Sequence, residues 1–224
     1  MIEIYGSPVS NCYNTVLAAL RFKDLTHKEF HIGASMDSSF RSRSPMGKIP
    51  YIVHAGQSIS ETSAIVEYLD EMTPGTALFP GDALMRARQR QLMKFVELYV
   101  ESPARRLFPG VFWGQENEAV AVSEVRPVME RGLDAVDILL GDNNFFHDEP
   151  FSAADFYTFF SLALAALVTE KQYGWSLLAN RPILARYLDK LNGVQFVDEI
   201  VAQRDGAMQA YLEKKAAEAA AQDQ

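Results

Sequence analysis

The sequence contains a single cysteine, Cys12, in 224 residues. One thiol excludes an intrachain disulfide framework and a Cys-x-x-Cys redox pair. No cluster of His and Cys has the spacing of metal ligands, so we expect no bound metal. The sequence also has neither a Gly-rich phosphate loop nor a legible Ser-His-Asp set, which argues against a P-loop nucleotide site and a serine hydrolase site.

Positive charge is also scarce, with 21 Lys and Arg residues against 29 Asp and Glu residues and a net charge of −8. This balance argues against nucleic acid or an anionic membrane as the main partner, although it allows a local basic patch. No apolar run is long enough to span a bilayer, and the first residues lack the features of a secretory signal. We therefore expect a cytoplasmic protein without a membrane or nucleic-acid partner.

Strand and helix patterns alternate in the first part of the chain. Residues 1–5 and 28–32 read as strands, and the segment between them has the apolar stripe of a helix that begins after Ser10. Residues 33–43 are Ser-rich and are expected to be irregular or a short helix. The order of these elements predicts an α/β unit.

Residues 48–69 carry the most informative pattern, which predicts a β-hairpin followed by a helix. Pro50 lies near the start of the first strand, where a proline is tolerated. Ser60 is the expected N-cap of the helix, and Glu61 supplies an acidic residue to its first turn. The N–H groups at the helix start, beside the Thr62 hydroxyl, could bind an anion, but any hairpin that leads into a capped helix would look similar.

Proline and glycine interrupt the chain at residues 72–81, and from Asp82 onward only helical patterns follow. We expect long helices over 83–107 and 118–140, and a kink or a break of the second one at Pro127. The two helices would pack as an antiparallel hairpin.

A second helical signature follows Phe151, where Ser152 and Asp155 have the spacing of a capping box with a hydrophobic staple. Residues 156–168 are apolar nearly all round and predict a buried central helix. The remaining expectations are a turn at Asn143-Asn144, a helix that begins at Asn180-Arg181-Pro182, a short apolar helix at 194–201, an interruption at Gly206, and a frayed or partly disordered tail over 211–224.

The succession of Ile49-Pro50, a hairpin, Glu61-Thr62-Ser63-Ala64-Ile65 and Tyr68-Leu69 resembles the glutathione-binding motif of the cytosolic glutathione transferase superfamily. The resemblance implies an α/β N-terminal thioredoxin-like domain, an all-α C-terminal helical bundle, and a homodimer that uses glutathione as its co-substrate. It places the first domain at 1–76, the linker at 77–81 and the helical domain at 82–224.

The resemblance also implies roles for individual residues. In that family the peptide bond before the proline is cis, and the residue before it pairs its backbone with the cysteinyl backbone of glutathione; these positions are Pro50 and Ile49. The γ-glutamyl group would be held by Glu61 and by Thr62, which replaces the usual serine and keeps the hydroxyl. Lys48 could pair with the glycyl carboxylate, or it could be a solvated lysine.

The thiol-activating group is expected at the start of the first helix. Residues 5–12 resemble the zeta-class pattern Tyr-x-x-x-x-Ser-Ser-Cys, whose first serine activates the thiol and falls on Ser10. A hydroxyl donor at a helix N-terminus would lower the thiol pKa and favour the thiolate, which is the nucleophile. Ser10 is therefore the predicted catalytic residue; the alternative interpretation is a plain N-cap. Asn11 replaces the second serine, and Cys12 is an alternative in the first helical turn, whereas Tyr5 is interpreted as a packing residue.

The electrophile pocket would lie between the two domains, and the sequence does not identify the electrophile. The aromatic and basic residues expected near this pocket are Tyr99, Arg105, Arg106, Phe108, Phe112 and Trp113. The function favoured by the sequence is that of a glutathione transferase. The alternatives are a zeta-like glutathione-dependent isomerase or dehalogenase and a non-catalytic binding protein with the same fold. Ser44, where the family usually has Asn, is a further departure that leaves the class open.

Overall fold

The computed structural model describes the backbone of residues 1–141 and 151–222, with side chains described up to position 214. The chain forms two compact units, one made of Met1–Leu78 with Gly193–Gln224 and the other of Phe79–Asn192. The first unit thus combines the N-terminal α/β region with the last helix of the chain. The predicted domain limits at 77–81 stay a prediction.

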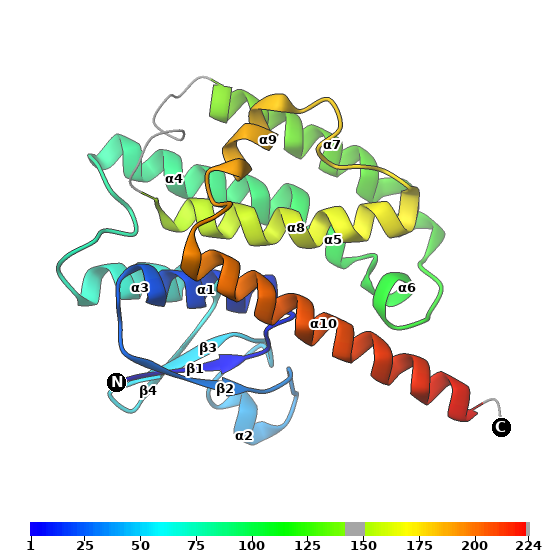
Figure 1. The fold of residues 1–224 in the computed structure, drawn as a ribbon, viewed down its shortest axis with the longest axis horizontal. Helices are drawn as coiled ribbons and strands as arrows, with labels where there is room; N and C mark the ends of the chain where they lie inside the picture. Colours follow the sequence, from blue (N-terminus) through cyan, green and yellow to red (C-terminus); the bar gives the residue numbers. More distant parts are fainter. Residues whose placement is uncertain (142–150, 223–224) are drawn as a thin grey trace. The chain divides into compact units, whose positions relative to one another are not determined.

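The first unit is built on a four-stranded sheet with strand order β2-β1-β3-β4. Strands β1 and β2 run parallel, whereas β3 is antiparallel to both β1 and β4. The strands are β1 (Ile2–Gly6), β2 (His27–His31), β3 (Tyr51–His54) and β4 (Gln57–Ser60), and the helices of the α/β region are α1 (Asn11–Phe22), α2 (Ser38–Arg41) and α3 (Thr62–Met72). Figure 1 shows α1 and α3 on one side of the sheet and the short α2 on the other.

The core of this unit lies between the sheet and helices α1 and α3. Alternate strand residues point toward these helices, since Ile2 and Ile4 are 3% and 0% exposed whereas their neighbours are half-buried. The helices contribute their apolar stripes, including Leu17 of α1 and Leu69 of α3, which are both fully buried. The alternating apolar residues of the strands and the apolar stripes of the two helices therefore pack together in one core.

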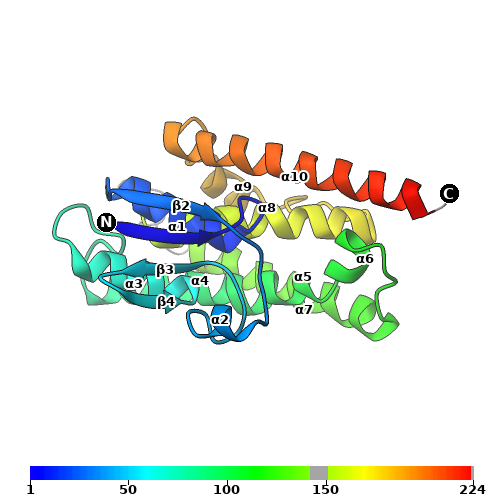
Figure 2. The same cartoon turned by 90° about the horizontal axis from the view of Figure 1, so that it is seen from below.

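The last helix, α10 (Gln195–Gln222), packs on α1 (Figure 2). The Phe22 and Phe196 rings have centroids 6.3 Å apart, and the Arg21 guanidinium lies 3.1 Å from the Glu199 carboxylate. The expected interruption at Gly206 is wrong, because α10 continues through this exposed residue. A glycine costs about 1 kcal/mol relative to alanine in a helix, which strong helix formers on either side can offset.

The second unit contains only helical segments within its described residues. They are α4 (Ala83–Val96), the π-helical η1 (Glu97–Glu101), α5 (Ser102–Arg105), α6 (Phe108–Phe112), α7 (Ala119–Gly141), α8 (Ala153–Tyr173) and α9 (Pro182–Asp189). The predicted helix over 83–107 thus includes a π-helical turn. At Gly132 of α7, an added Cβ would lie 2.6 Å from the Tyr99 Cβ, so a glycine permits the close approach of α7 to η1.

Helix α8 begins with the predicted capping box. The Ser152 N–H donates to the Asp155 carboxylate at 2.6 Å, and the Phe151 and Phe156 rings have centroids 6.4 Å apart, as in a hydrophobic staple. By length and composition α8 could cross a membrane, but 67% of its most apolar window is buried inside the protein. This burial is the property of a core helix, and the search covered the described residues only.

Two further expectations need correction. The predicted break at Pro127 is wrong, because helix α7 continues through this residue, whereas the alternative of a kink stays a prediction. Pro127 and Ser123, four residues before it, are both exposed to water. The N-cap of α3 is Glu61 rather than Ser60, since Ser60 pairs with Tyr51 at the end of β4. The turn expected at Asn143-Asn144 lies outside the described residues.

Candidate functional site

The turn that leads from β1 into α1 positions Ser10. Gly6 ends the strand, and an added Cβ there would lie 2.5 Å from the Tyr13 ring, so this position requires a glycine. The Ser10 N–H donates to the Ser7 carbonyl at 2.9 Å, and the Ser10 Oγ accepts from the Tyr13 N–H at 3.3 Å. Ser10 is therefore the N-cap of α1, as predicted.

The cap leaves the Ser10 hydroxyl hydrogen available. A hydroxyl has one hydrogen to donate and two lone pairs, and the cap uses only a lone pair. Among the described residues, no acceptor takes the Ser10 hydroxyl hydrogen. The side chain is half-buried at the N-terminus of α1, where the helix dipole favours negative charge. This corner can thus donate a hydrogen bond to an anion such as a thiolate.

The neighbouring candidates differ in their surroundings. Asn11 is buried, at 3% exposure, whereas Cys12 is partly exposed in the first turn of α1. The Tyr5 ring stacks on the rings of Phe30 and Tyr51, with centroids 4.6 Å and 4.7 Å apart. Burial and the hydrogen bond to a nearby carboxylate, that of Glu3, raise the pKa of Tyr5. These contacts agree with the interpretation of Tyr5 as a packing residue.

The loop before β3 carries the second group of predicted residues. The Ile49–Pro50 peptide bond is cis, as the motif implied. Ser44 is buried, and its hydroxyl donates to the Lys48 carbonyl at 2.7 Å, whereas the Lys48 side chain is exposed. The N–H and carbonyl of Ile49 form no hydrogen bond with the described part of the chain. They can therefore pair with an extended peptide backbone.

Glu61 has an unusual backbone conformation at the start of α3. Its φ is 72° and its ψ is 119°, in a region that non-glycine residues rarely occupy. Strain of this kind costs on the order of 1–3 kcal/mol and concentrates at functional sites. The Glu61 side chain is exposed and gives α3 no cap hydrogen bond, and Thr62 is 8% exposed. Within the described part of the chain, the first N–H groups of α3 and the Glu61 carboxylate have no partner and can thus bind a ligand.

The sheet register brings these three segments to one end of the sheet. Tyr5 pairs with Tyr51, which pairs in turn with Ser60. Adjacent strands are about 4.8 Å apart, so Tyr5, Tyr51 and Ser60 lie side by side. The turn to Ser10 follows β1, Ile49 precedes β3, and α3 follows β4, so all three segments begin or end near this row of residues. The structure therefore brings together the first-unit residues predicted for the site.

Sequence reasoning missed two contacts that support this region. His54 is half-buried and lies with its Nδ1 2.7 Å from the Tyr68 hydroxyl oxygen, which ties the hairpin to α3. Asn14 is 1% exposed, and its side-chain Nδ2 donates to the Pro8 carbonyl at 2.9 Å. The signal for Asn14 was a polar residue on the apolar face of α1.

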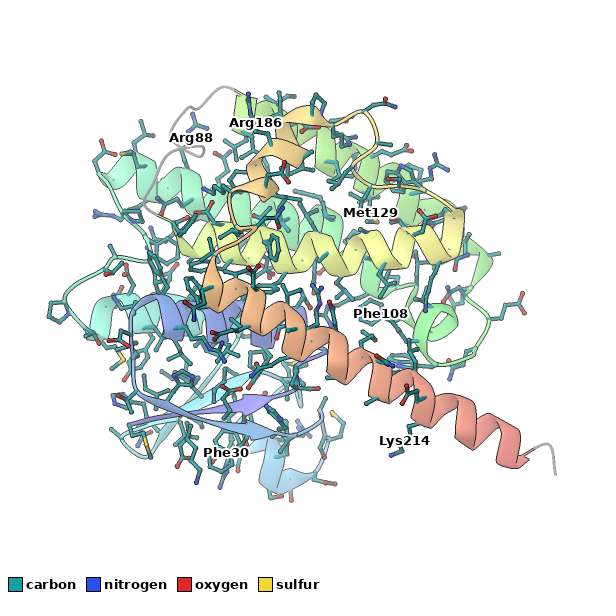
Figure 3. All side chains as sticks on the ribbon, viewed as in Figure 1. Phe30, Arg88, Phe108, Met129, Arg186 and Lys214 are labelled. Atoms are coloured by element: carbon teal, nitrogen blue, oxygen red, sulfur yellow. The ribbon has the colours of Figure 1, made fainter. Side chains whose placement is uncertain are left out.

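The second-unit candidates form one aromatic cluster and two ion pairs. The Phe108 ring lies against those of Phe112 and Trp113, with centroids 5.1 Å and 6.5 Å apart, and Figure 3 labels Phe108 on α6. Arg105 pairs with Glu101 and lies over the Phe108 ring. Of the other two candidates, Arg106 pairs with Glu124 of α7, and Tyr99 lies on η1.

A shallow cavity of about 340 Å³ lies at the other end of α1. Its lining includes Arg21 and His27 of the α/β region and Glu199 of α10, and it contains no residue predicted for the site. Within the described residues, no group of three or more His, Cys, Asp or Glu side chains could hold a metal ion.

Comparison with known proteins gives one consistent family. A family model described as the glutathione S-transferase N-terminal domain matches residues 4–77. A glutathione S-transferase from Pseudomonas putida is 30% identical over 213 residues, which cover 95% of this chain and 97% of that protein. A maleylacetoacetate isomerase from Pseudomonas aeruginosa is 30% identical over 166 residues, which cover 70% of this chain and 77% of that protein.

A solved structure supports the same fold. Glutathione transferase F2 from Populus trichocarpa matches with a TM-score of 0.76 and 17% sequence identity, and the match covers 92% of this chain and 100% of that chain. The predicted fold class, an α/β thioredoxin-like domain followed by a helical domain, is thereby confirmed.

Proposed function

The chain belongs to the glutathione S-transferase superfamily, and we propose that its Ser10 hydroxyl stabilises the thiolate of glutathione for attack on a small electrophile. Glutathione is the co-substrate of this enzyme. The observation that carries the assignment of Ser10 is its capping geometry, in which Oγ accepts from the Tyr13 N–H and keeps its hydrogen for an anion.

The peptide would bind along the row of segments at the end of the sheet. Ile49 presents unpaired backbone groups to the cysteinyl backbone of glutathione, next to the cis bond into Pro50. Glu61 and Thr62 would hold the γ-glutamyl group, whose amine suits a carboxylate and whose carboxylate suits a helix N-terminus. Lys48 has an exposed ammonium group that would pair with the glycyl carboxylate.

The chemical gain comes from the pKa of the thiol. A free thiol has a pKa of about 8.5, so only about 3% is ionised at neutral pH. Lowering this pKa by about two units requires about 2.7 kcal/mol of preferential stabilisation of the thiolate. A hydroxyl donor and the N-terminus of α1 are of the right kind and strength to supply it. The sulfur then forms a bond to the electrophilic carbon, and a leaving group departs or a proton is added.

The test is a comparison of Ser10→Ala with Ser10→Thr. Removing the donor should lower kcat about a hundredfold, as for other single donors to a reacting anion. The KM for glutathione should change by no more than about threefold, because the peptide contacts remain. Threonine keeps both the hydroxyl and the cap and should retain most of the turnover.

Loss of the cap itself needs a separate control. Asp82 caps α4 in the second unit by accepting from the Met85 N–H at 2.8 Å, so Asp82→Ala removes a comparable cap, worth about 1 kcal/mol, from a helix that carries no predicted glutathione-binding residue. It should lower thermal stability without changing kcat. Unaltered turnover in Ser10→Ala would show that another group, such as Cys12, activates the thiol.

One alternative activity is favoured by the relative from Pseudomonas aeruginosa, a maleylacetoacetate isomerase. In an isomerase or a dehalogenase of this type, the thiolate would add to the substrate and be released again. Measuring the glutathione consumed per product molecule separates the two reactions, because conjugation consumes one glutathione per product and isomerisation consumes none.

The proposal also includes the oligomeric state and the cellular location of the protein. A homodimer and a cytoplasmic location follow from the resemblance to the family, and light scattering of the purified protein tests the first. The electrophile is a small molecule whose class would be found by screening a panel of haloaromatic, epoxide and unsaturated carbonyl compounds.

A further inference from the structure

Asn14 is a buried polar residue with no obvious reason to be in a helix. It lies in α1, one turn after Ser10, and is 1% exposed. Asparagine is a poor helix former, and burying its amide without partners would be unfavourable. Its Nδ2 donates to the Pro8 carbonyl at 2.9 Å, which is outside the helix. The side chain therefore serves the turn before α1 rather than the helix itself.

The turn that contains Ser10 is held from both sides by this residue. The Asn14 backbone N–H donates to the Ser10 carbonyl at 3.0 Å, while the Asn14 side chain holds the Pro8 carbonyl. A third bond, from the Ser10 N–H to the Ser7 carbonyl, closes the turn at 2.9 Å. Because proline has no N–H of its own, the Pro8 carbonyl is its only backbone hydrogen-bonding group, and Asn14 takes it.

The capping hydrogen bond alone fixes the position of the Ser10 side chain only weakly. Its length of 3.3 Å lies beyond the usual range of N–H to oxygen bonds, whereas the Asn14 to Pro8 bond has a normal length. The position of the Ser10 oxygen thus depends on the backbone of the turn more than on the cap. A reacting group displaced by about 1 Å can lose about a hundredfold in rate.

We propose that Asn14 is a positioning residue for thiolate formation: its amide fixes the Pro8 carbonyl and so holds the Ser10 hydroxyl where it can donate to the sulfur of glutathione. This inference rests on the proposed function of Ser10. Because Asn14 is 1% exposed, it would act through the turn and not by touching glutathione or the electrophile.

The test uses two variants that remove the amide in different ways. Asn14→Leu fills the buried volume and Asn14→Ala empties it, so an effect that both share results from the lost hydrogen bond. The matched control is Thr15→Val, since Thr15 is fully buried in the same helix. Among the described residues its hydroxyl bonds only within α1, to the Asn11 carbonyl at 3.0 Å.

Two readouts distinguish positioning from stability. We expect kcat to fall about tenfold in both Asn14 variants, while the KM for glutathione stays within about twofold. The ultraviolet absorbance of bound thiolate, titrated against pH, should have a midpoint about one unit higher than in the wild type. Thr15→Val should lower the melting temperature and leave both the midpoint and kcat unchanged.

Each outcome decides between the proposals when Ser10→Ala is measured alongside. Loss of thiolate in Ser10→Ala with a wild-type midpoint in both Asn14 variants would overturn the role of Asn14 and leave the proposed function intact. Asn14 variants that lose activity only in proportion to their unfolded fraction, as Thr15→Val does, would also overturn it. Wild-type thiolate in Ser10→Ala would refute the proposed function of Ser10, and the positioning role would fail with it.

Discussion

Replacing Glu29 with glutamine should weaken the first unit in a pH-dependent way. Glu29 lies on β2, and its carboxylate accepts from the Tyr13 hydroxyl at 2.7 Å. It also lies 3.8 Å from His27, 3.6 Å from Arg21 and 3.5 Å from His31. The neighbouring His27, together with the Tyr13 hydroxyl and the two other bases, lowers the Glu29 pKa to about 2 against the opposing effect of burial.

The size of the effect follows from this shift. The ordinary pKa is 4.5, and the difference from about 2 corresponds to about 3 kcal/mol of stabilisation at neutral pH. Glutamine keeps an acceptor for the Tyr13 hydroxyl and loses the charge. We therefore expect Glu29→Gln to lower the free energy of unfolding by about 2 kcal/mol at pH 6.

The pH profile follows from two pKa shifts of opposite direction. The Glu29 pKa is lowered on folding, so its contribution is present above the unfolded value of 4.5 and is lost as the pH falls toward 2. The nearby Glu29 carboxylate raises the pKa of His27, so this contribution is present below the unfolded value of 6.5 and is lost as the pH rises through the folded value. The difference between wild type and variant should be largest between these limits.

Urea unfolding at several pH values measures this difference directly. The matched control is Glu3→Gln, since Glu3 also accepts from a tyrosine hydroxyl, that of Tyr5 at 2.7 Å, on the same sheet. We expect a change below about 0.5 kcal/mol for it. The reasoning is refuted if Glu29→Gln gives the same destabilisation at every pH, because that pattern would indicate lost packing and not lost charge.

Two further predictions concern the second unit. Asp155→Ala leaves the Ser152 N–H, the Tyr187 hydroxyl and the Lys190 ammonium without their shared partner. Thermal unfolding should therefore show that the free energy of unfolding falls by about 3–5 kcal/mol, and a fall below about 1 kcal/mol would contradict the prediction. Gly132→Ala places a Cβ 2.8 Å from the Tyr99 carbonyl oxygen and must push α7 away from η1. We expect urea unfolding to show that the free energy of unfolding falls by about 1–3 kcal/mol, whereas unchanged stability would show that the helices separate freely.

The sequence was sufficient where the deciding interaction is local. The N-cap at Ser10 and the box of Ser152 with Asp155 each join residues three apart, and both are present. The cis bond before Pro50 could be expected only from the resemblance, since local propensity favours the trans form. These features are set by short segments, so their patterns are legible without the fold.

Local rules failed where tertiary structure competes with them. Ser60 is a good N-cap by residue type, but pairing with Tyr51 keeps it in β4 and moves the cap to Glu61, at a positive φ. Pro127 was expected to kink or break its helix and Gly206 to interrupt one, but both helices continue through these exposed residues. In α7, packing of the opposite face, where Val125 and Met129 are fully buried, outweighs the cost of Pro127, whereas Gly206 costs only about 1 kcal/mol, which neighbouring helix formers can offset.

The long-range contacts were out of reach of the sequence, and one of them connects stability to the site. Tyr13 is fully buried; its backbone N–H caps at Ser10, and its hydroxyl reaches Glu29, sixteen positions away. The same side chain fills the space beside Gly6. The charge network of Glu29 therefore fixes a residue that also contacts the proposed donor. If Tyr13 is held mainly by its packing, Tyr13→Phe, which removes only the hydroxyl, will lower stability while the thiolate midpoint of bound glutathione stays unchanged. If the hydroxyl bond holds it, the two quantities will shift together.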